Sequence, residues 1–491
     1  MSDTKSIPAP ESDTRFFGHP RGLATLFLTE MGERFNFYGV RGLLILFMTA
    51  SAANGGLGFD VKKAAMIYGL YMSSVYLLSL PGGWIADRLI GARRAVLYGG
   101  ILISAGAFCF LSPSLTAFYL GLLIIVLGTG LLKPNVSTIV GMLYAPGDHR
   151  RDAGFSIFYM GINLGAVLAS LICGWVGQKI NWHLGLALGG VGMLLAVIQF
   201  ALQGKYLGNS GKEASHSPGA RRTALLAIIA GVAAIVIAAA ALRAAHIEIT
   251  AALINDTFGA GLLGLSVVMF AWLIFGPGWS PIERKRFLAI LVLFVASSLF
   301  WAAYEQAGST MSLFAEHSTR KDILGFNYPA SWFQSLNSFF IIAFAPVFAW
   351  LWIKLGRRDP SSPAKFALGL FLIGLGFVVL VPAAFFAQTA QVSSLWLTAS
   401  YLFQTFGELA LSPVGLSAMT KLAPARVTSL MMGLWFMTIS IGEYVGGRLA
   451  AFYVALAPPT LFAIVAAFSI GAAVVLFFLI KPTVRLMSGV K

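Results

Sequence analysis

The sequence predicts an all-α membrane protein, and three observations support this fold class. Of the 491 residues, 58% are hydrophobic and only 11% are charged, and the mean hydropathy is +0.82. Apolar runs of about 20 residues, each long enough to cross a hydrocarbon core as a helix, recur along the chain. The 34 Lys and Arg residues lie mainly in short segments between these runs, as the positive-inside rule describes. We therefore expect membrane lipids, and no nucleic acid, as partners.

The apolar runs form two sets of six with two further runs between them, which predicts 14 transmembrane helices. The first set is 22–50, 64–86, 93–112, 115–143, 153–176 and 182–203, the accessory runs are 222–245 and 250–276, and the second set is 287–313, 331–356, 364–388, 393–420, 427–456 and 459–481. Two six-helix bundles around a site near the bilayer midplane are typical of secondary transporters. We expect a tail 1–21, an N-terminal bundle 22–203, a linker with accessory helices 204–286, a C-terminal bundle 287–481 and a tail 482–491. The arginine-rich loops predict that both tails are cytoplasmic.

The first apolar run contains the stretch "TEMGERFNFYGVR", which places four ionisable groups where each is costly. A charge at the centre of a bilayer costs a few kcal/mol, so such a face must point at protein or water. On a helical wheel of about 100° per residue, six side chains share one face: Glu30, Glu33, Arg34, Phe37, Tyr38 and Arg41. The face could be a structural ion-pair network between helices or the wall of a polar cavity.

Isolated polar and aromatic groups interrupt other apolar runs in the same way. These are Lys133, which precedes Pro134, and Asn163, Trp301, Glu305, Asn337, Glu408, Trp435 and Glu443. The first half supplies cations and the second half supplies carboxylates, which suits a zwitterion with separated amino and carboxylate ends. The same charges could instead pair with one another across the halves, and both arrangements could occur in turn during a transport cycle.

A loop motif after the second run resembles that of the major facilitator superfamily. The stretch "GGWIADRLIGARR" carries it, through Gly83, Asp87, Arg88, Gly91, Arg93 and Arg94. The resemblance implies the fold of that superfamily and a cytoplasmic latch. Asp87 and the three arginines of this loop would act in gating, because their ion pairs can break when the bundles rock.

Further motifs resemble the proton-dependent oligopeptide transporter (POT) family across nearly the whole chain. They are "EMGERFNFY", "GTGLLKPNVS", "FYMGINLG", "FWAAYEQAGS", "WFQSLN" and "GELALSPVG". The two accessory helices resemble the extra pair of bacterial members, which implies a bacterial inner membrane. This chain departs from the family pattern at Phe37, where the family usually has Tyr, and at Glu443, where we expect Asn.

The resemblance implies a proton-coupled symporter of di- and tripeptides that works by alternating access, with the proton as coupling ion and no other cofactor. Arg34, Lys133 and Arg41 would meet the peptide carboxylate, and Asn163, Asn337 and Glu408 the amino terminus and backbone. Tyr38, Tyr68, Trp301 and Trp435 would line side-chain pockets. Glu30, Glu33 and Glu305 are the candidates for proton handling. We expect a monomer.

Three other functions remain open on the sequence. A carrier of nitrate or another small organic anion could use the same scaffold, although Glu408 favours a substrate with a cationic amine. A membrane-embedded enzyme is disfavoured, because the six histidines show no metal-ligand spacing and no nucleophile motif stands out. A channel would need a continuous water path, and it would not accumulate a substrate against its gradient.

Overall fold

The computed structural model describes residues 13–145, 148, 150–212, 218–244, 250–323, 325–424 and 427–490. These residues form helices, apart from loops and one short hairpin. The long helices are α1 (Arg21–Thr49), α2 (Val61–Leu77), α4 (Ala92–Cys109), α5 (Leu115–Met142), α6 (Arg150–Trp175), α7 (Trp182–Gln203), α8 (Pro218–Ala244), α9 (Ala251–Phe275), α10 (Pro281–Tyr304), α12 (Ser335–Leu355), α13 (Ser362–Phe386), α14 (Leu395–Leu422), α15 (Thr428–Ala450) and α16 (Pro458–Leu486). The shorter elements are α3 (Ser79–Ile85), α11 (Thr310–Ser318), the single turns η2 (Ala52–Asn54), η3 (Ala86–Ile90), η4 (Val176–Ile180), η5 (Gly204–Leu207), η6 (Glu305–Gly308), η7 (Ala330–Gln334) and η8 (Gly356–Arg358), and the antiparallel strands β1 (Asp322–Ile323) and β2 (Phe326–Asn327).

Each predicted apolar run contains a long helix, which confirms the predicted fold class, although the run 64–86 is divided into α2 and α3 at Leu78. Within the described residues, nine helices are both long and apolar enough to cross a membrane. Helix α1 is not among these nine, because its charged residues interrupt every stretch of sufficient length. A search for long apolar stretches alone therefore does not find α1, because of its charged residues.

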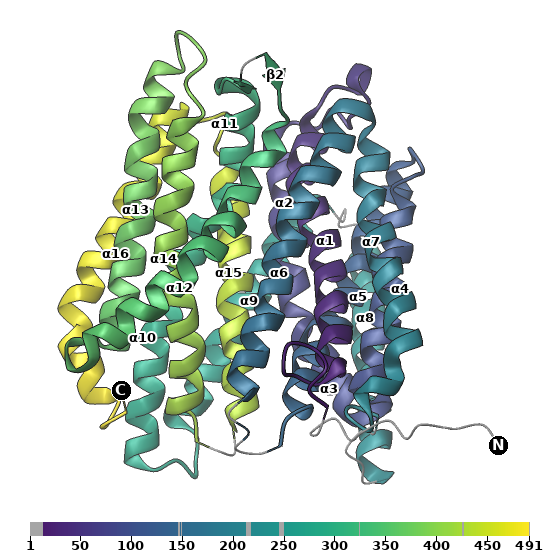
Figure 1. Cartoon of the computed structure of the whole chain (residues 1–491), viewed down its shortest axis with the longest axis vertical. Coiled ribbons are helices and arrows are strands. Elements are labelled where there is room, and N and C mark those ends of the chain that lie inside the picture. The colour runs from purple at the N-terminus through teal and green to yellow at the C-terminus, as the bar shows by residue number, and fades with distance from the viewer. Residues whose placement is uncertain are drawn as a thin grey trace. The chain divides into compact units, whose positions relative to one another are not determined.

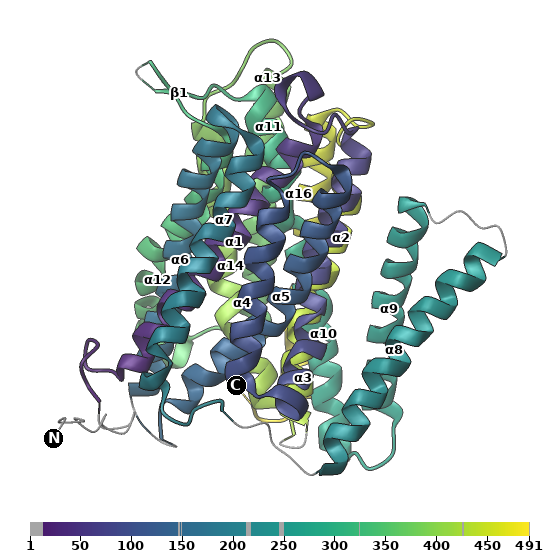
Figure 2. The same ribbon diagram turned by 90° about the vertical axis from the view of Figure 1, so that its right-hand side faces the viewer.

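The chain packs as two compact units, and their boundaries cut through α1. The first unit combines Met1–Val40, Leu78–Cys173 and His183–Leu253, and the second combines Arg41–Leu77, Gly174–Trp182 and Ile254–Lys491. The first unit has a core of aliphatic and aromatic side chains from α1, α4, α5, α6 and α7, including Leu26, Val136 and Met193. Helices α4 and α5 run side by side within it (Figures 1 and 2). The division into two six-helix bundles with tails and a linker stays a prediction.

The second unit is built around the packing of α13 on α14 and α16, and of α15 on α2 and α10. Helices α13, α14 and α16 lie together at the left of Figure 1. Glycine allows α2 and α15 to cross closely, since a Cβ on Gly69 of α2 would lie 2.8 Å from the Cα of Gly447 in α15. Ser73 and Ser440 extend the same crossing through a hydroxyl pair at 2.8 Å.

The seventh main span differs from its prediction at both ends. Helix α10 begins at Pro281, six residues before the expected start, because Ser280 and Glu283 form a capping box that satisfies the first backbone N–H groups. The helix ends at Tyr304, and the 3-10 turn η6 then carries the chain to α11. Glu305 therefore lies at a break in the helix, where its backbone departs from the regular ladder.

Two positions of the "GGWIADRLIGARR" motif need glycine, because other backbone atoms lie against them. At Gly82, an added Cβ would overlap the carbonyl oxygen of Gly130 in α5. This carbonyl lacks its usual helical donor, because residue 134 is a proline without a backbone N–H. Gly91 has φ +82°, and a Cβ there would meet the Lys212 carbonyl oxygen at 2.8 Å. The motif thus fixes the packing of α3 on α5 and the start of α4.

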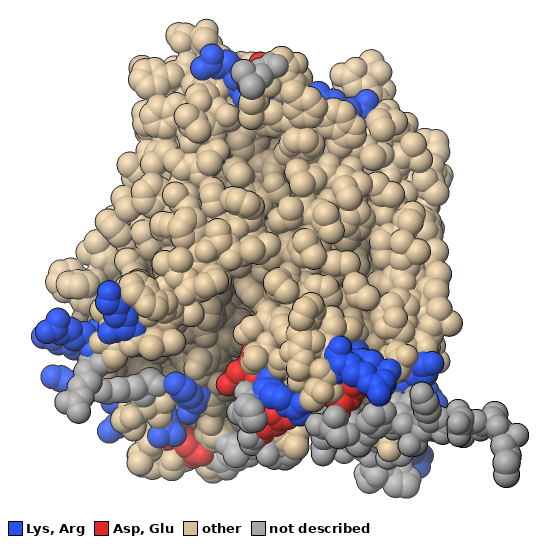
Figure 3. Space-filling view, viewed as in Figure 1, with Lys and Arg blue, Asp and Glu red and all other residues tan. Residues whose placement is uncertain are grey.

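Charged side chains avoid the middle of the face shown in Figure 3. Lys, Arg, Asp and Glu gather at its two ends, and the wide band between them shows neither blue nor red. Exposed apolar side chains on the long helices, such as Leu195, Val267 and Phe478, are 63%, 68% and 72% exposed. A band of this kind matches the hydrocarbon region of a bilayer.

Candidate functional site

The first group of site residues is the α1 cluster, which we define as Glu30, Glu33, Arg34 and Lys133. Arg34 Nη2 donates to Oε1 of Glu33 at 2.5 Å and Arg34 Nε donates to Oε2, so the guanidinium holds this carboxylate at two points. Arg34 Nε also lies 3.6 Å from Oε1 of Glu30, one helical turn away. The two glutamates and Arg34 are at most 3% exposed. The wheel prediction of a shared face is therefore confirmed for these three residues.

Lys133 enters the α1 cluster from α5 and brings the charges into balance. Its ammonium acts electrostatically on Glu30 and lies 5.6 Å from the ring centre of Phe37. The Arg34 guanidinium carbon lies 4.4 Å from the same ring centre. Phe37 thus presents its π-face to both cations, a role in which the family's hydroxyl is not needed.

The other predicted residues of the first unit lie near the α1 cluster on α1 and α6. Tyr38 is partly exposed on α1 and makes an edge contact with Phe37. Asn163 is buried on α6, where its amide donates to the Tyr159 carbonyl at 3.0 Å. Gly165 allows α6 to approach α1 closely, since a Cβ added at this position would lie 3.1 Å from the Arg34 Cβ.

The second group is the Arg41 cluster, which we define as Arg41, Tyr68 and Glu305. Arg41 Nη2 donates to Oε2 of Glu305 at 2.7 Å, and Arg41 Nε donates to the Tyr68 hydroxyl at 3.3 Å. All three residues are at most 5% exposed. Arg41 from the first half of the sequence thus pairs with Glu305 from the second half, which is one of the two arrangements that the sequence left open.

A third arrangement joins α12 and α14 through Asn337 and Glu408. The Asn337 amide donates to Oε2 of Glu408 at 2.9 Å and to the Thr405 hydroxyl at 3.1 Å. Asn337 is 7% exposed, while Glu408 is partly exposed. The amide fixes one carboxylate oxygen of Glu408, and the same carboxylate can accept from a further donor such as an ammonium group.

The two predicted tryptophans lie in the second unit, Trp301 on α10 and Trp435 on α15. Trp301 makes edge contacts with Tyr304 at 5.0 Å between ring centres and packs against Gly442 of α15. Its indole N–H is buried and has no hydrogen-bond partner among the described residues. Trp435 is 4% exposed and packs on Gly415 and on Phe366, with a ring separation of 6.5 Å.

The predicted gating residues lie where the second span meets α4. Asp87 and Arg88 are exposed, and the Arg88 guanidinium lies 5.4 Å from a ring centre of Trp84. Arg93 donates from its side chain to the Gly208 carbonyl at 3.0 Å and from its backbone to Gly211 at 2.8 Å. Arg94 is exposed. Arg93 therefore fastens the segment after α7 to the start of α4, and the gating role of the four residues stays a prediction.

The sequence argument missed two residues that the structure places in these clusters. The Tyr304 ring centre lies 5.9 Å from the Arg41 guanidinium carbon, and Thr405 orients Asn337. Tyr304 belongs to the quoted stretch "FWAAYEQAGS", so a helical wheel of α10 could have identified it. Thr405 carried no signal, because a threonine in an apolar helix most often bonds its own backbone.

The part of the chain that the structure describes contains no set of side chains that could bind a metal ion. No three His, Cys, Asp or Glu side chains there approach one another closely enough to share an ion. The buried carboxylates are held by guanidinium, ammonium and amide groups instead.

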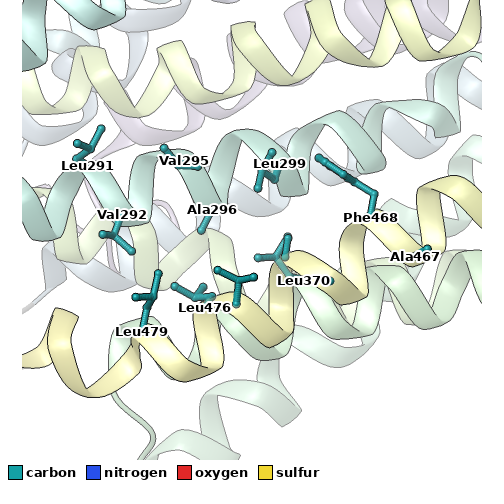
Figure 4. Close-up of a pocket in the computed structure, with 13 residues that line it drawn as sticks. Leu291, Val292, Val295, Ala296, Leu299, Leu370, Ala467, Phe468, Leu476 and Leu479 are labelled. Carbon is teal, nitrogen blue, oxygen red and sulfur yellow. The ribbon is translucent and has the colours of Figure 1, made fainter.

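A separate apolar cavity of about 560 Å³ lies between α10, α13 and α16 (Figure 4). Its walls are aliphatic side chains with one aromatic ring, including Leu291, Val295, Leu370, Phe468 and Leu479. No charged side chain lines it, so it offers nothing to the charged ends of a zwitterion. Large apolar residues at its edge are exposed, as expected for a groove facing lipid chains.

Comparisons with known proteins agree with this arrangement of helices. The model of the POT family matches residues 93–461. The chain is 41% identical to "Peptide transporter YePEPT" of Yersinia enterocolitica, over 96% of each sequence, and 36% identical to "Di-/tripeptide transporter" of Lactococcus lactis subsp. lactis, over 98% of this chain and 99% of the relative. It is also similar to a crystal structure described as "peptide transporter POT in complex with sulfate", with 42% identity, full coverage of both chains and a TM-score of 0.93.

Proposed function

This chain belongs to the POT family, and from that premise we propose that it is a proton-coupled symporter that takes up di- and tripeptides by alternating access. The relatives named as peptide and di-/tripeptide transporters support the substrate class. None of these names points to nitrate or another small anion. The activity is transport across a membrane, without chemical change of the substrate.

The observation that carries the proposal is the two-point contact between Arg34 and Glu33 within the α1 cluster. A peptide carboxylate can take the place of Glu33 on the guanidinium, because Arg binds carboxylates at two points with high geometric specificity. Glu33 would then be buried without its cation, and a buried carboxylate in that state takes up a proton. Peptide binding and proton uptake would be coupled through this exchange, with Glu30 and Lys133 completing the charge balance.

The amino end of the peptide would meet Glu408, whose carboxylate is oriented by Asn337. Asn163 would contact the peptide backbone. Trp301, Trp435, Tyr38 and Tyr68 would form the walls of side-chain pockets. The buried indole N–H of Trp301 supports such a role, because a buried donor costs free energy unless a partner meets it.

Alternating access requires contacts that form on one side and break on the other. The pair between Arg41 and Glu305 and the crossing of Gly69 on Gly447 join α1 and α2 to α10 and α15. These contacts would open when the first bundle moves away from the second. On the cytoplasmic side, Asp87, Arg88, Arg93 and Arg94 would form the opposing latch.

The proposal is tested by uptake into proteoliposomes under an imposed pH gradient. Dialanine, trialanine, free alanine and nitrate are compared in parallel, and saturable accumulation of the two peptides alone is the expected result. Accumulation of nitrate without peptide would reject the proposal. Glu408→Gln should weaken peptide uptake strongly and leave an anion carrier unaffected.

The role of Glu33 is tested with Glu33→Gln, which mimics the protonated side chain. We expect this variant to lose accumulation driven by the pH gradient while it still exchanges labelled for unlabelled dialanine. Glu316→Gln is the control, because Glu316 is a partly exposed carboxylate that pairs with Lys321 and accepts from Gln178, outside the two charged clusters. Full gradient-driven accumulation by Glu33→Gln would show that this residue does not couple protons.

Further parts of the proposal concern location and assembly. The protein would lie in a bacterial inner membrane with both termini in the cytoplasm, since the basic loops follow the positive-inside rule. It would work as a monomer surrounded by lipid. Reaction of cysteines introduced into the two tails with membrane-impermeant reagents tests the orientation.

A further inference from the structure

The apolar cavity between α10, α13 and α16 has no role in the transport scheme above. All three helices belong to the second unit, and the cavity has a volume of about 560 Å³. It is open at its edge, where Val295, Phe468 and Val475 are 47%, 43% and 60% exposed. An apolar space of this size takes up a hydrocarbon group in preference to water.

Small residues of α16 make room for the cavity. Ala467, Gly471 and Ala472 line it, and a Cβ added at Gly471 would meet nothing within 4 Å. Along α16 the lining runs from Ala467 to Leu479, which is about 18 Å at 1.5 Å per residue. Half of the hydrocarbon core of a bilayer is about 15 Å thick. The cavity therefore matches the depth of one leaflet, and one acyl chain can lie along it.

Helices α10 and α16 run in opposite directions along the cavity, so the start of one and the end of the other lie at the same end. Figure 4 shows Leu291 and Leu479 at this end and Leu299 toward the other. Lys285 precedes Leu291 by six residues and Arg485 follows Leu479 by six, each about 9 Å further along its helix. Two basic residues from different helices thus lie just beyond one end of the cavity.

A helical wheel places both basic side chains on the cavity side of their helices. At about 100° per residue, the lining residues of α10 span an arc of about 140°, and Lys285 falls within it. Arg485 falls in the direction of Ala467, at the edge of the lining arc of α16. Both side chains are exposed. Their ammonium and guanidinium groups can therefore reach a ligand whose apolar part lies in the cavity.

Other charges near this end do not oppose the binding of an anion. Arg284 also falls within the arc of α10 and adds a third positive charge. Glu283 falls on the other side of α10, where its carboxylate accepts from the Ser280 backbone at 2.7 Å. Asp359, before the start of α13, pairs with Lys365 at 2.8 Å. This end of the cavity is therefore positively charged.

An anionic phospholipid has the two kinds of group that this arrangement fits, an apolar acyl chain and a negatively charged phosphate. Basic side chains between transmembrane helices bind such headgroups. We propose that the cavity is a binding site for an anionic phospholipid, with one acyl chain along α10 and α16 and the phosphate on Lys285 and Arg485. The site lies outside the charged clusters, so it does not depend on which substrate the protein carries.

The test compares phosphatidylglycerol with phosphatidylcholine, which has the same acyl chains and a headgroup without net charge. The delipidated full chain in detergent at low salt receives equal amounts of both lipids, and native mass spectrometry measures the ratio bound. We expect phosphatidylglycerol to be preferred. Lys285→Gln with Arg485→Gln should reduce this preference about 30-fold, because each cation near an anionic headgroup contributes about fivefold.

The matched control is Arg221→Gln with Arg222→Gln. It removes two exposed positive charges from the start of α8 and should keep the wild-type preference. Equal binding of the two lipids by the wild type overturns the proposal. An unchanged preference in the folded double variant of Lys285 and Arg485 also overturns it.

Filling the cavity tests the place of the acyl chain. Gly471→Phe puts a ring into the cavity without a clash at its Cβ, and it should reduce the bound phosphatidylglycerol several-fold. Gly471→Leu serves if that variant does not fold. Gly261→Phe on α9 is the control, since a Cβ there also meets nothing within 4 Å. Undiminished binding by a folded Gly471 variant would reject the cavity as the site.

Glycerol phosphate distinguishes a lipid from a free phosphate, because it has the charged group without acyl chains. We expect no displacement of phosphatidylglycerol by an equal concentration of glycerol phosphate. Displacement would show a site for phosphate alone and would overturn the proposal.

Discussion

The two clusters of buried charge differ in how far apart their members lie along the chain. Glu33 and Arg34 are sequence neighbours on α1, and Glu30 is one turn away. Arg41 and Glu305 are 264 residues apart and come from α1 and η6. Three members of the α1 cluster thus lie on one helix and Lys133 reaches them from α5, whereas the Arg41 cluster exists only while distant segments touch. In the proposed transport cycle, the first arrangement would bind a charge of the ligand and the second would act as a gate.

The largest effect on stability should come from breaking the long-range pair. Arg41→Ala leaves Glu305 buried without its cation, which should cost about 3–5 kcal/mol. The melting temperature of the purified protein in detergent measures the loss. Arg41→Ala with Glu305→Gln should recover part of it, because the double variant has no isolated charge at either position.

The control for this pair is Lys321→Ala, which breaks the pair with Glu316, whose side chain is 35% exposed. Solvent-exposed pairs contribute about 0–1 kcal/mol, so the loss of this partly exposed pair should cost less than the loss of the fully buried one. If Arg41→Ala lowered the melting temperature no more than Lys321→Ala, the Arg41 cluster would not hold these segments together.

The next largest effect should come from replacing Arg34, the guanidinium of the α1 cluster, and it should appear in peptide uptake. Arg34→Ala should reduce dialanine uptake more than about 100-fold, roughly 2.7 kcal/mol, because the peptide carboxylate loses its two-point partner. Arg34→Lys should fall between this variant and the wild type, since an ammonium binds a carboxylate as a point charge. Wild-type uptake by Arg34→Ala would contradict the assignment.

A smaller effect is expected at the crossing of α2 and α15. Gly69→Ala places a methyl group 2.8 Å from the Gly447 Cα and 3.2 Å from the Glu443 carbonyl oxygen, and overpacking of this kind costs about 1–3 kcal/mol. In a cysteine-free background, a cysteine at Ser440 should react several-fold faster with a maleimide when Gly69 is Ala. Gly261→Ala on α9, where a Cβ meets nothing within 4 Å, should leave the rate unchanged.

The smallest effect should come from the aromatic ring between the two cations. Phe37→Leu removes a face that contributes about 0.5–2 kcal/mol, so we expect the KM for dialanine to rise a few-fold. Phe37→Tyr keeps the face and should resemble the wild type. An unchanged KM in Phe37→Leu would mean that the ring only fills space in the α1 cluster.

Local features of the site could be predicted from the sequence. The shared face of Glu30, Glu33 and Arg34 followed from helical periodicity, because residues three and four apart meet on one side of a helix. The long helices followed from apolar runs of membrane length. Both are properties of short windows of sequence, so no knowledge of distant contacts was needed.

The partners of Arg41 could not be derived in the same way. The wheel places Arg41 beside Arg34, yet its carboxylate partner comes from η6. The break in α10 at Tyr304, which positions Glu305, follows no proline and has no strong sequence signal. Long-range pairs depend on how helices pack, and periodicity within one helix carries no information on its neighbours.

The contact of Gly82 with Gly130 predicts how these positions vary among relatives. Pro134 leaves the Gly130 carbonyl without its usual donor, and that carbonyl occupies the space where a side chain at position 82 would begin. A relative that replaces Pro134 regains the hydrogen bond from position 134 to the carbonyl, which draws the oxygen back toward the helix axis. Larger residues at position 82 should therefore occur together with loss of the proline, as a covarying pair 52 residues apart.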